Sequence, residues 1–381
     1  MRSPLFKHIR HTHSCSFLIQ SAPLNANRSK SVPMPEENYF PPEWAQQSAV
    51  MLAWPYGTGD FSPWLDETEK TYSAIAKAVT DHEPLIVLCQ SHEHQRHIEN
   101  QLETARVTRE QVRFLDIPYN DVWVRDTAPL SVQALGAPRL LNFRFNGWGN
   151  KYDHTLDAQL GSQLQELGLF PHAVMEHVDF VLEGGSLETD GAGTILTTSR
   201  CLLNANRNPQ LSKGEIEKRL MAYFGLKRIL WLEHGHAEGD DTDAHVDTLA
   251  RYCDANTIAY TACDDETDPL FQELKAMAEE LAKFTDCNGA AYKLVPLPIP
   301  RPIFDSEGFR LPATYANFLI INGAVLLPVY QDPADQIAIS RLATCFPDRD
   351  ILPIYATPLI RQYGSIHCMT MQFPQFVSVS L

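Results

Sequence analysis

The sequence predicts a mixed α/β fold in which five units of similar build form a ring. A β-hairpin pattern recurs at intervals of about 55–66 residues, and each hairpin is followed by a helical pattern and a further apolar run. This interval is too long for most solenoid repeats, whereas it suits a closed ring of large modules. Five units of strand, strand, helix and strand would fill residues 40–381.

Four hairpins are expected because tight-turn residues separate apolar runs. Asp-Gly and Asn-Gly between such runs are strong hairpin signals. The expected hairpins and their turns are Ala128–Phe145 near Gly136, Gly185–Thr198 at Asp190–Gly191, Thr248–Thr261 near Asp254–Asn256, and Ala316–Tyr330 at Asn322–Gly323.

Helical patterns lie between the hairpins. Ser212 and Glu215 have the spacing of a capping box, which predicts a helix that continues to about Phe224 and ends at Gly225. A short strand, Arg228–Leu232, should follow. The other expected elements are helices at Trp64–Thr80, Asp268–Phe284 and Asp332–Cys345, and a buried strand at Pro84–Cys89.

The first 35 residues differ in composition from the rest of the chain. Residues 1–35 contain no Asp or Glu, and their bases are Arg2, Lys7, Arg10, Arg28 and Lys30. This composition resembles an organelle transit peptide or an unstructured leader, and an alternative is that Met34 is the true start. We therefore expect one catalytic domain over residues 36–381, located in the cytoplasm unless the leader targets an organelle.

Charge and cysteine usage exclude several classes of protein. A net charge of −16 disfavours nucleic acid as a partner and favours a small cation. The longest apolar run, near Phe318–Tyr330, is too short to span a membrane. The eight cysteines are widely spread without a CxxC pair, which argues against a disulfide framework and a zinc knuckle. Both a monomer and a homo-oligomer are compatible with the sequence.

Polar clusters fall at equivalent places, at the edges of the hairpins. A single cysteine is usually buried and inert, and an acidic run is usually a solvated loop. In a ring, however, these edges converge on one axis and would build a polar pocket. The clusters are Asn120–Thr127, Glu183–Ser186, Asp240–Asp247 and Gly364–Thr370.

A metal site is the other use of these residues. His245 and Asp247 alternate on an expected strand, so their side chains would face the same way, and Asp241 and Asp243 could join them as ligands. However, the sequence has no HExxH pattern, and no second histidine has a comparable setting. We expect no metal and no cofactor.

Together the four clusters resemble those of the agmatine deiminase family, and the terminal Gly-x-x-His-Cys-x-Thr is the most specific of them. This family belongs to the guanidine-modifying superfamily, with the arginine deiminases, peptidylarginine deiminases and amidinotransferases. The resemblance covers residues 34–381, including Pro42–Trp54, Phe143–Tyr152 and Asn204–Ser212. It implies a five-bladed α/β propeller of ββαβ units with pseudo-fivefold symmetry.

The resemblance also implies roles for particular residues. The nucleophile would be Cys368 and the general acid and base His245. The carboxylates of Asp126, Asp247 and Glu183 would complete the catalytic set, and Trp123 would wall the pocket. The chain departs from the family pattern at Ala128, at Ala244, and at Arg361–Gly364 before the terminal motif, where many members carry glycine.

The chemistry implied is hydrolysis of agmatine to N-carbamoylputrescine and ammonia through a covalent Cys-thiouronium. Asp126 and Asp247 would clamp the planar guanidinium, and Glu183 would orient His245. Either the bound cation or His245 would stabilise the thiolate. Asp241 in its acidic run fits a cationic tail. His367 is expected on a strand, facing away from the site in a structural role.

Three alternatives remain at this stage. The same chemistry could act on arginine or peptidyl-arginine, for which Arg361 or Arg144 could bind the carboxylate. An inactive protein that binds polyamine-like cations is an alternative of another class, although the intact catalytic set argues against it. A metal hydrolase ranks third.

Overall fold

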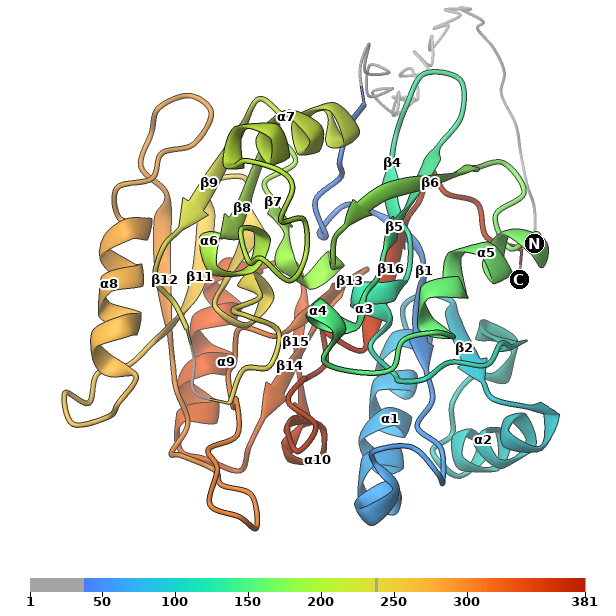
Figure 1. Cartoon of the computed structure of the whole chain (residues 1–381). Helices are drawn as coiled ribbons and strands as arrows, with labels where there is room; N and C mark the ends of the chain where they lie inside the picture. The colour runs from blue at the N-terminus through green and yellow to red at the C-terminus, as the bar shows by residue number, and fades with distance from the viewer. Residues whose placement is uncertain (1–37, 237–238, 381) are drawn as a thin grey trace, which may run out of the picture. The chain divides into compact units, whose positions relative to one another are not determined.

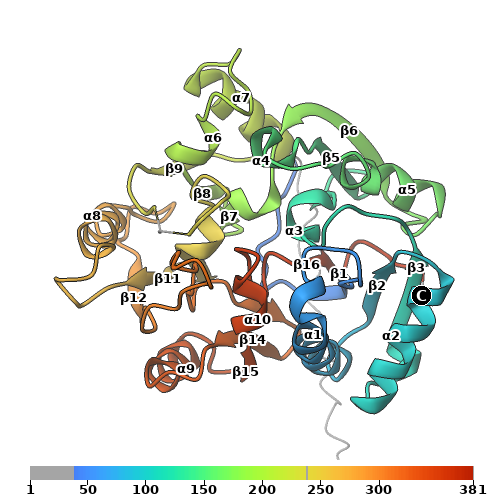
Figure 2. The same cartoon turned by 60° about the horizontal axis from the view of Figure 1, so that its bottom comes forward.

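The computed structural model describes residues 38–236 and 239–380. The segment interpreted as a leader, residues 1–35, lies outside the described residues. The chain from Pro35 to Leu381 forms one compact unit, in which five small sheets surround a common axis (Figures 1 and 2). This is the predicted five-bladed α/β arrangement, and it is confirmed by the similarity to solved structures reported below.

One sheet closes the ring. It has the strand order β16-β1-β2-β3, in which β16 pairs antiparallel with β1 and the other pairs are parallel. The last strand of the chain therefore completes the sheet that the first strand begins. The bounds are β1 Gln47–Ala53, β2 Leu85–Cys89, β3 Val112–Asp116 and β16 Thr370–Pro374.

The other four sheets share one topology, in which an antiparallel hairpin is extended by a parallel third strand. All four predicted hairpins are confirmed. The bounds are β4 Leu130–Val132, β5 Arg139–Arg144 and β6 Val174–Val181; β7 Glu188–Thr189, β8 Thr194–Thr198 and β9 Arg228–Leu232; β10 Ala250–Asp254, β11 Thr257–Ala262 and β12 Lys293–Pro298; β13 Leu319–Ile321, β14 Ala324–Val329 and β15 Asp350–Tyr355.

Helices connect the parallel strands and lie around the outside of the ring (Figure 2). A parallel connection must cross over the sheet, and a helix is the usual way to do so. The longer helices are α1 Leu65–Thr80, α2 His92–Thr104, α5 Leu160–Glu166, α7 Lys213–Phe224, α8 Phe271–Leu281 and α9 Ala334–Cys345. Each helix predicted from the sequence is present, although α8 is shorter at both ends than the Asp268–Phe284 pattern suggested.

Short helices lie between the longer elements. The α-helical ones are α3 Val124–Thr127, α4 Gly147–Asn150, α6 Ser199–Leu202 and α10 Thr357–Ile360. The 3-10 helices are η1 Ser62–Trp64, η2 Arg109–Gln111, η3 Asp157–Gln159, η4 Gly184–Ser186 and η5 Val246–Thr248. Three of these short helices, α3, η4 and η5, carry or adjoin the polar clusters.

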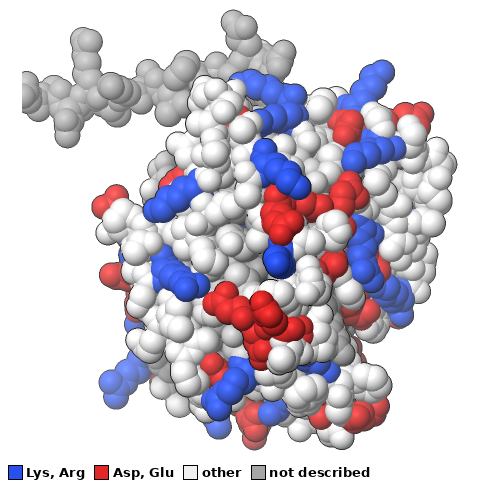
Figure 3. Space-filling view, turned by 90° about the vertical axis from the view of Figure 1, so that its left-hand side faces the viewer, with Lys and Arg blue, Asp and Glu red and all other residues white. Residues whose placement is uncertain are grey.

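Two features of the described residues bear on possible partners. Within residues 38–236 and 239–380, no helix combines the length and apolar character needed to cross a bilayer. The face drawn in Figure 3 carries interspersed acidic and basic side chains, so on this face the described residues form no continuous basic surface of the kind that binds nucleic acid.

Helix α7 shows how local sequence signals fix a boundary. Its first turn has the predicted capping box, in which Glu215 Oε2 accepts from the Ser212 backbone N–H at 2.8 Å. Its end is Gly225, in the left-handed conformation with φ 67°. A Cβ at Gly225 would lie 1.7 Å from the carbonyl oxygen of Asn38, so a side chain is excluded by both strain and space.

We expect Gly225→Ala to lower the free energy of unfolding by about 2 kcal/mol or more, because left-handed backbone costs an alanine about 1–2 kcal/mol before the clash is added. Gly214→Ala in the same helix is the matched control, since its Cβ would meet nothing within 4 Å. The control should gain up to about 1 kcal/mol from helix propensity. Urea unfolding of both variants measures the difference, and equal stabilities would contradict the cap assignment.

Candidate active site

The predicted catalytic residues come from segments that precede the antiparallel edge strand of four sheets. Asp126 lies on α3 before β4, and Glu183 lies just before η4 and β7. His245 and Asp247 lie at η5 before β10, and Cys368 lies in the turn before β16. The equivalent segment of the remaining sheet, before β13, carries Asn317. The ring therefore brings the edges of all five sheets together, as the sequence pattern predicted.

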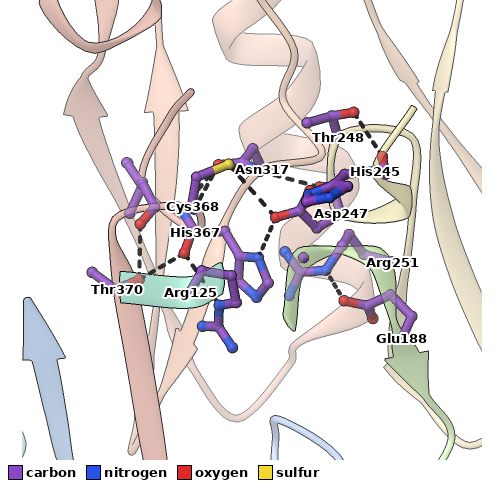
Figure 4. Close-up of polar contacts among 12 residues, drawn as sticks. Arg125, Glu188, His245, Asp247, Thr248, Arg251, Asn317, His367, Cys368 and Thr370 are labelled. Atoms are coloured by element: carbon purple, nitrogen blue, oxygen red, sulfur yellow. Dashed lines mark hydrogen bonds and ion pairs between the residues drawn. The ribbon is translucent and has the colours of Figure 1, made fainter. Parts of the chain in front are cut away.

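Cys368 contacts residues from two other sheets (Figure 4). Its Sγ lies 3.6 Å from Asp247 Oδ2 and 3.2 Å from Asn317 Nδ2. Burial raises the pKa of the Cys368 thiol well above its usual value, and the nearby charges of Asp247 and Asp126 add to the effect. The thiol is therefore protonated at neutral pH while no cation occupies the site.

Asp126 is held with its carboxylate toward the axis. Its Oδ1 accepts from the Gly185 backbone N–H and its Oδ2 from Trp148 Nε1, both at 2.9 Å. His245 Nδ1 lies 3.8 Å from the same Oδ1. Burial raises the pKa of Asp126, and the positive charge of His245 only partly offsets that effect.

His245 is buried, and neither of its ring nitrogens has a hydrogen-bond partner in the described structure. Burial disfavours its charged form. The charge of Asp126, contact with Cys201 and the charge of Glu183 outweigh that effect and raise the pKa of His245 to about 10. His245 is therefore an imidazolium at neutral pH, suited to donate a proton rather than to accept one from Cys368.

These groups come together closely around Gly185, which has no side chain. A Cβ there would lie 2.7 Å from His245 Nδ1, 2.9 Å from Asp126 Oδ1 and 3.1 Å from Asp247 Oδ2. The two carboxylates and the histidine thus converge on one point. Asp247 Oδ1 is also buried without a partner. An unpaired buried carboxylate oxygen is costly, so the arrangement suits an incoming donor.

A pocket opens above this convergence point, with Asp126 and Cys368 in its lining. Its walls are aromatic and acidic, and among the described residues that line it there is no Lys or Arg. They are Asp60, Asp121, Trp123, Asp126, Trp148, Tyr152, Asp241, Thr242, Gln362, Tyr363, Gly364 and Cys368. Both residues expected from sequence to contact substrate in addition to the catalytic set, Trp123 and Asp241, are in this lining.

Glu183 is placed differently from the expectation. In the described structure no hydrogen bond joins it to His245. Instead, Arg207 Nε lies 3.0 Å from Glu183 Oε1 and 2.9 Å from Oε2, in an ion pair that is fully buried. Glu183 remains close to His245, because polar atoms of these two residues and Cys201 lie within 4.8 Å of one another. Glu183 thus acts on His245 by its charge, not by a hydrogen bond.

Two local predictions were wrong. His245 and Asp247 do not alternate on a strand, because η5 follows His245 directly and includes Asp247. His367 is not on a strand that faces away. It lies in the turn before β16, and its Nδ1 is 2.8 Å from Asp247 Oδ2. In both cases the backbone makes a tight turn that points these side chains toward the axis. On an extended strand, successive side chains would point to opposite faces.

Sequence reasoning missed three supporting residues, namely Trp148, Arg207 and Asn317. The first two fall in segments that carried the family resemblance, and Asn317 stands where the other sheets present their polar clusters. Of the four residues weighed as metal ligands, Asp243 pairs with Arg207 at 2.7 Å, and the carboxylate of Asp241 accepts from the Tyr152 hydroxyl. Those contacts occupy oxygens that an ion would need.

Comparison with known proteins identifies the group to which this geometry belongs. A family model described as Porphyromonas-type peptidyl-arginine deiminase matches residues 39–374. The chain belongs to this family. It is 33% identical to the agmatine deiminase of Pseudomonas savastanoi pv. phaseolicola over 90% of this chain and 97% of that protein.

Solved structures extend the similarity to the fold. A cysteine-to-serine variant of C. jejuni agmatine deiminase with substrate bound matches with a TM-score of 0.82 at 37% identity, over 90% of this chain and 97% of that one. The agmatine deiminase of Enterococcus faecalis matches with a TM-score of 0.80 at 29% identity, over 92% and 99%. The predicted membership of the agmatine deiminase family is confirmed.

The close approach of the three groups to Gly185 can be tested directly. We expect Gly185→Ala to lower kcat/KM by about 100-fold or more, because a methyl group would displace His245, Asp126 or Asp247, and a shift of about 1 Å can cost that much. Gly57→Ala is the control, since its Cβ would meet nothing within 4 Å. Steady-state kinetics and melting temperatures separate loss of function from loss of fold. An active Gly185→Ala enzyme would show that the three groups need not converge.

Proposed function

We propose that the chain hydrolyses agmatine to N-carbamoylputrescine and ammonia. The observation that carries this proposal is the pocket above Cys368, whose lining includes four carboxylates and no basic side chain among the described residues. Such a pocket favours a substrate that is cationic at both ends, as agmatine is. The agmatine deiminases among the relatives support the same conclusion.

The guanidinium would lie between Asp126 and Asp247. Asp126 Oδ1 and Asp247 Oδ2 both lie close to Gly185, and Asp247 Oδ1 has no partner, so the two carboxylates can accept N–H groups from a planar cation. Both acids are almost completely buried, which strengthens these contacts. The clamp would hold the central carbon close to Cys368 Sγ.

The first half-reaction would form the covalent intermediate. The bound cation offsets the negative charge around Cys368, so the thiol releases its proton to solvent and attacks as thiolate. Sγ bonds to the guanidine carbon and gives a tetrahedral adduct. His245, charged in the free site, protonates the leaving nitrogen, the C–N bond breaks, and ammonia departs from a thiouronium.

The second half-reaction would return the enzyme to its starting state. His245 is now neutral and takes a proton from water, which attacks the thiouronium carbon. Collapse of this adduct breaks the C–S bond, the hydroxyl proton passes to the departing sulfur, and the neutral urea derivative is left beside the Cys368 thiol. Glu183 and its partner Arg207 would keep a negative charge beside His245 throughout. The residues proposed to carry both steps need neither a metal nor a cofactor.

Asp121 is our candidate for binding the tail amine. It lines the pocket, is partly buried, and has no ion-pair partner among the described residues. Burial, helped by Asp157 and Asp60, raises the pKa of Asp121 to about 7, which an ammonium would reverse. Asp241 is also in the wall, but Lys151 Nζ lies 3.7 Å from it.

The structure offers arginine no obvious partner for its carboxylate. Arg361 is 3.0 Å from Glu67, and Arg144 is 2.8 Å from Asp179. Neither is in the pocket lining. Turnover of free arginine is therefore the weaker alternative.

We also propose a cytoplasmic location. The cysteines of the described residues are all free thiols, as in a reducing compartment.

The decisive assay is ammonia release from agmatine, arginine and a peptidyl-arginine substrate, with chelator present. We expect turnover of agmatine alone, and a loss of at least about 10⁴-fold in Cys368→Ala, the size seen when a nucleophile is removed. Preference for arginine would contradict agmatine as the substrate but would leave the proposed mechanism unchanged. Binding of agmatine without turnover would favour an inactive cation-binding protein.

A second expectation concerns the residue that binds the tail amine of agmatine. Asp121→Asn should raise KM for agmatine about 10–100-fold, because a hydrogen bond to a charged group contributes about 1.5–3 kcal/mol. The conservative replacement keeps the shape of the wall. Asp179→Asn, whose side chain is 90% exposed, is the matched control and should change nothing. An unchanged KM in Asp121→Asn would remove this residue from the tail site.

A further inference from the structure

A buried histidine next to the nucleophile is not used in the mechanism above. We propose that His367 is a positioning residue, which holds Asp247 ionised and turned so that one of its oxygens is free for the guanidinium. The inference rests on the proposed function, because it concerns how the same site receives its cation.

Both ring nitrogens of His367 face carboxylates. Nδ1 lies 2.8 Å from Asp247 Oδ2, and Nε2 lies 2.7 Å from Glu43 Oε2 (Figure 4 shows the contact to Asp247). The side chain is only 2% exposed. A neutral imidazole has one N–H and can donate to one acceptor only, so two carboxylate partners require the doubly protonated, charged ring.

The surrounding charges support this protonation state. Glu43 Oε2 also lies 2.9 Å from Arg251 Nη2 and 4.0 Å from Arg125 Nη2, and Arg251 Nε pairs with Glu188. These groups make one buried network. Its acids are Asp247, Glu43 and Glu188, and its bases are Arg251, Arg125 and His367. Three negative charges are matched by three positive charges only when His367 is protonated, and unmatched buried charge is costly.

The two carboxylates proposed to hold the guanidinium differ in the direction of their pKa shifts, as contact with His367 would cause. Both are buried and both lie close to Gly185. Burial raises the pKa of Asp126. For Asp247 burial acts the same way, but the hydrogen bond and charge of His367 outweigh it and hold the pKa below its usual range.

The same contact sets the direction of Asp247. Its Oδ2 is engaged by His367 Nδ1 and lies 3.6 Å from Cys368 Sγ. Its Oδ1 is left buried and without a partner. A carboxylate fixed through one oxygen presents the other in a defined direction, which is what a clamp on a planar cation requires.

The test uses two replacements that lack the charge of His367. His367→Asn puts a neutral amide donor near the position of Nδ1, within reach of Asp247, whereas the amide of His367→Gln lies near Nε2 and faces Glu43. We expect His367→Gln to raise the Kd of agmatine at least tenfold, and His367→Asn to recover part of this loss. Calorimetry in the Cys368→Ala background measures affinity without turnover.

A pH profile provides the readout that packing alone would not change. With Cys368 intact, we expect the acid limb of kcat/KM to move to higher pH by at least one unit in both variants, because neither supplies the charge that keeps Asp247 ionised. His97→Gln is the matched control. Its Nε2 also contacts a carboxylate, Glu69 at 2.7 Å, but on α2 at the outside of the ring.

The outcomes separate the two claims. Variants that melt at a lower temperature but keep the parental Kd and acid limb would overturn the positioning role and leave the proposed function intact. Absence of agmatine binding in the parental Cys368→Ala protein, with His367 unchanged, would overturn the proposed function itself. If His367→Gln does not fold, the shift of the acid limb in His367→Asn decides the question.

Discussion

The candidate site depends on the pairing of the last strand with the first. β16 runs antiparallel to β1, with Met371 opposite Met51, and this pairing completes the ring. Because the turn that carries Cys368 directly precedes β16, the ladder of backbone hydrogen bonds also fixes the sulfur against segments from the other sheets. Strand register is specified strongly where both faces are buried, since a slip of one residue reverses every side chain.

Charge pairing within the ring complements this closure. Glu183 is matched by Arg207, and Glu43 and Glu188 by Arg251. Around Gly185, Asp126 and Asp247 have His245 and His367 as positive neighbours, but Asp247 Oδ1 is left without a hydrogen-bond partner. A buried surplus of acceptors is unfavourable until a cation supplies donors. Selectivity for a guanidinium therefore follows from what the protein leaves unmatched.

Much of the fold was predictable because its signals are local. Asn322–Gly323 and Asp190–Gly191 mark turns within a few residues, and the Ser212–Glu215 capping box fixes the start of α7. That the candidate catalytic residues would come together was predictable from four motifs at equivalent hairpin edges. Their individual contacts were not. Glu183 and Arg207 are 24 residues apart, and His367 and Glu43 are 324 apart. No local pattern predicts contacts between residues so far apart in the sequence. In addition, residues expected on strands lie in short turns, so their side chains point in other directions than those inferred.

The burial of Cys368 also bears on how long the enzyme survives between turnovers. Peroxides and alkylating agents attack thiolates far faster than thiols. In the mechanism proposed above, Cys368 keeps its proton until the cation binds, so the free enzyme would present little thiolate to these reagents. The resting enzyme would therefore react slowly with these reagents. The reactive thiolate would form only when the bound substrate covers the sulfur.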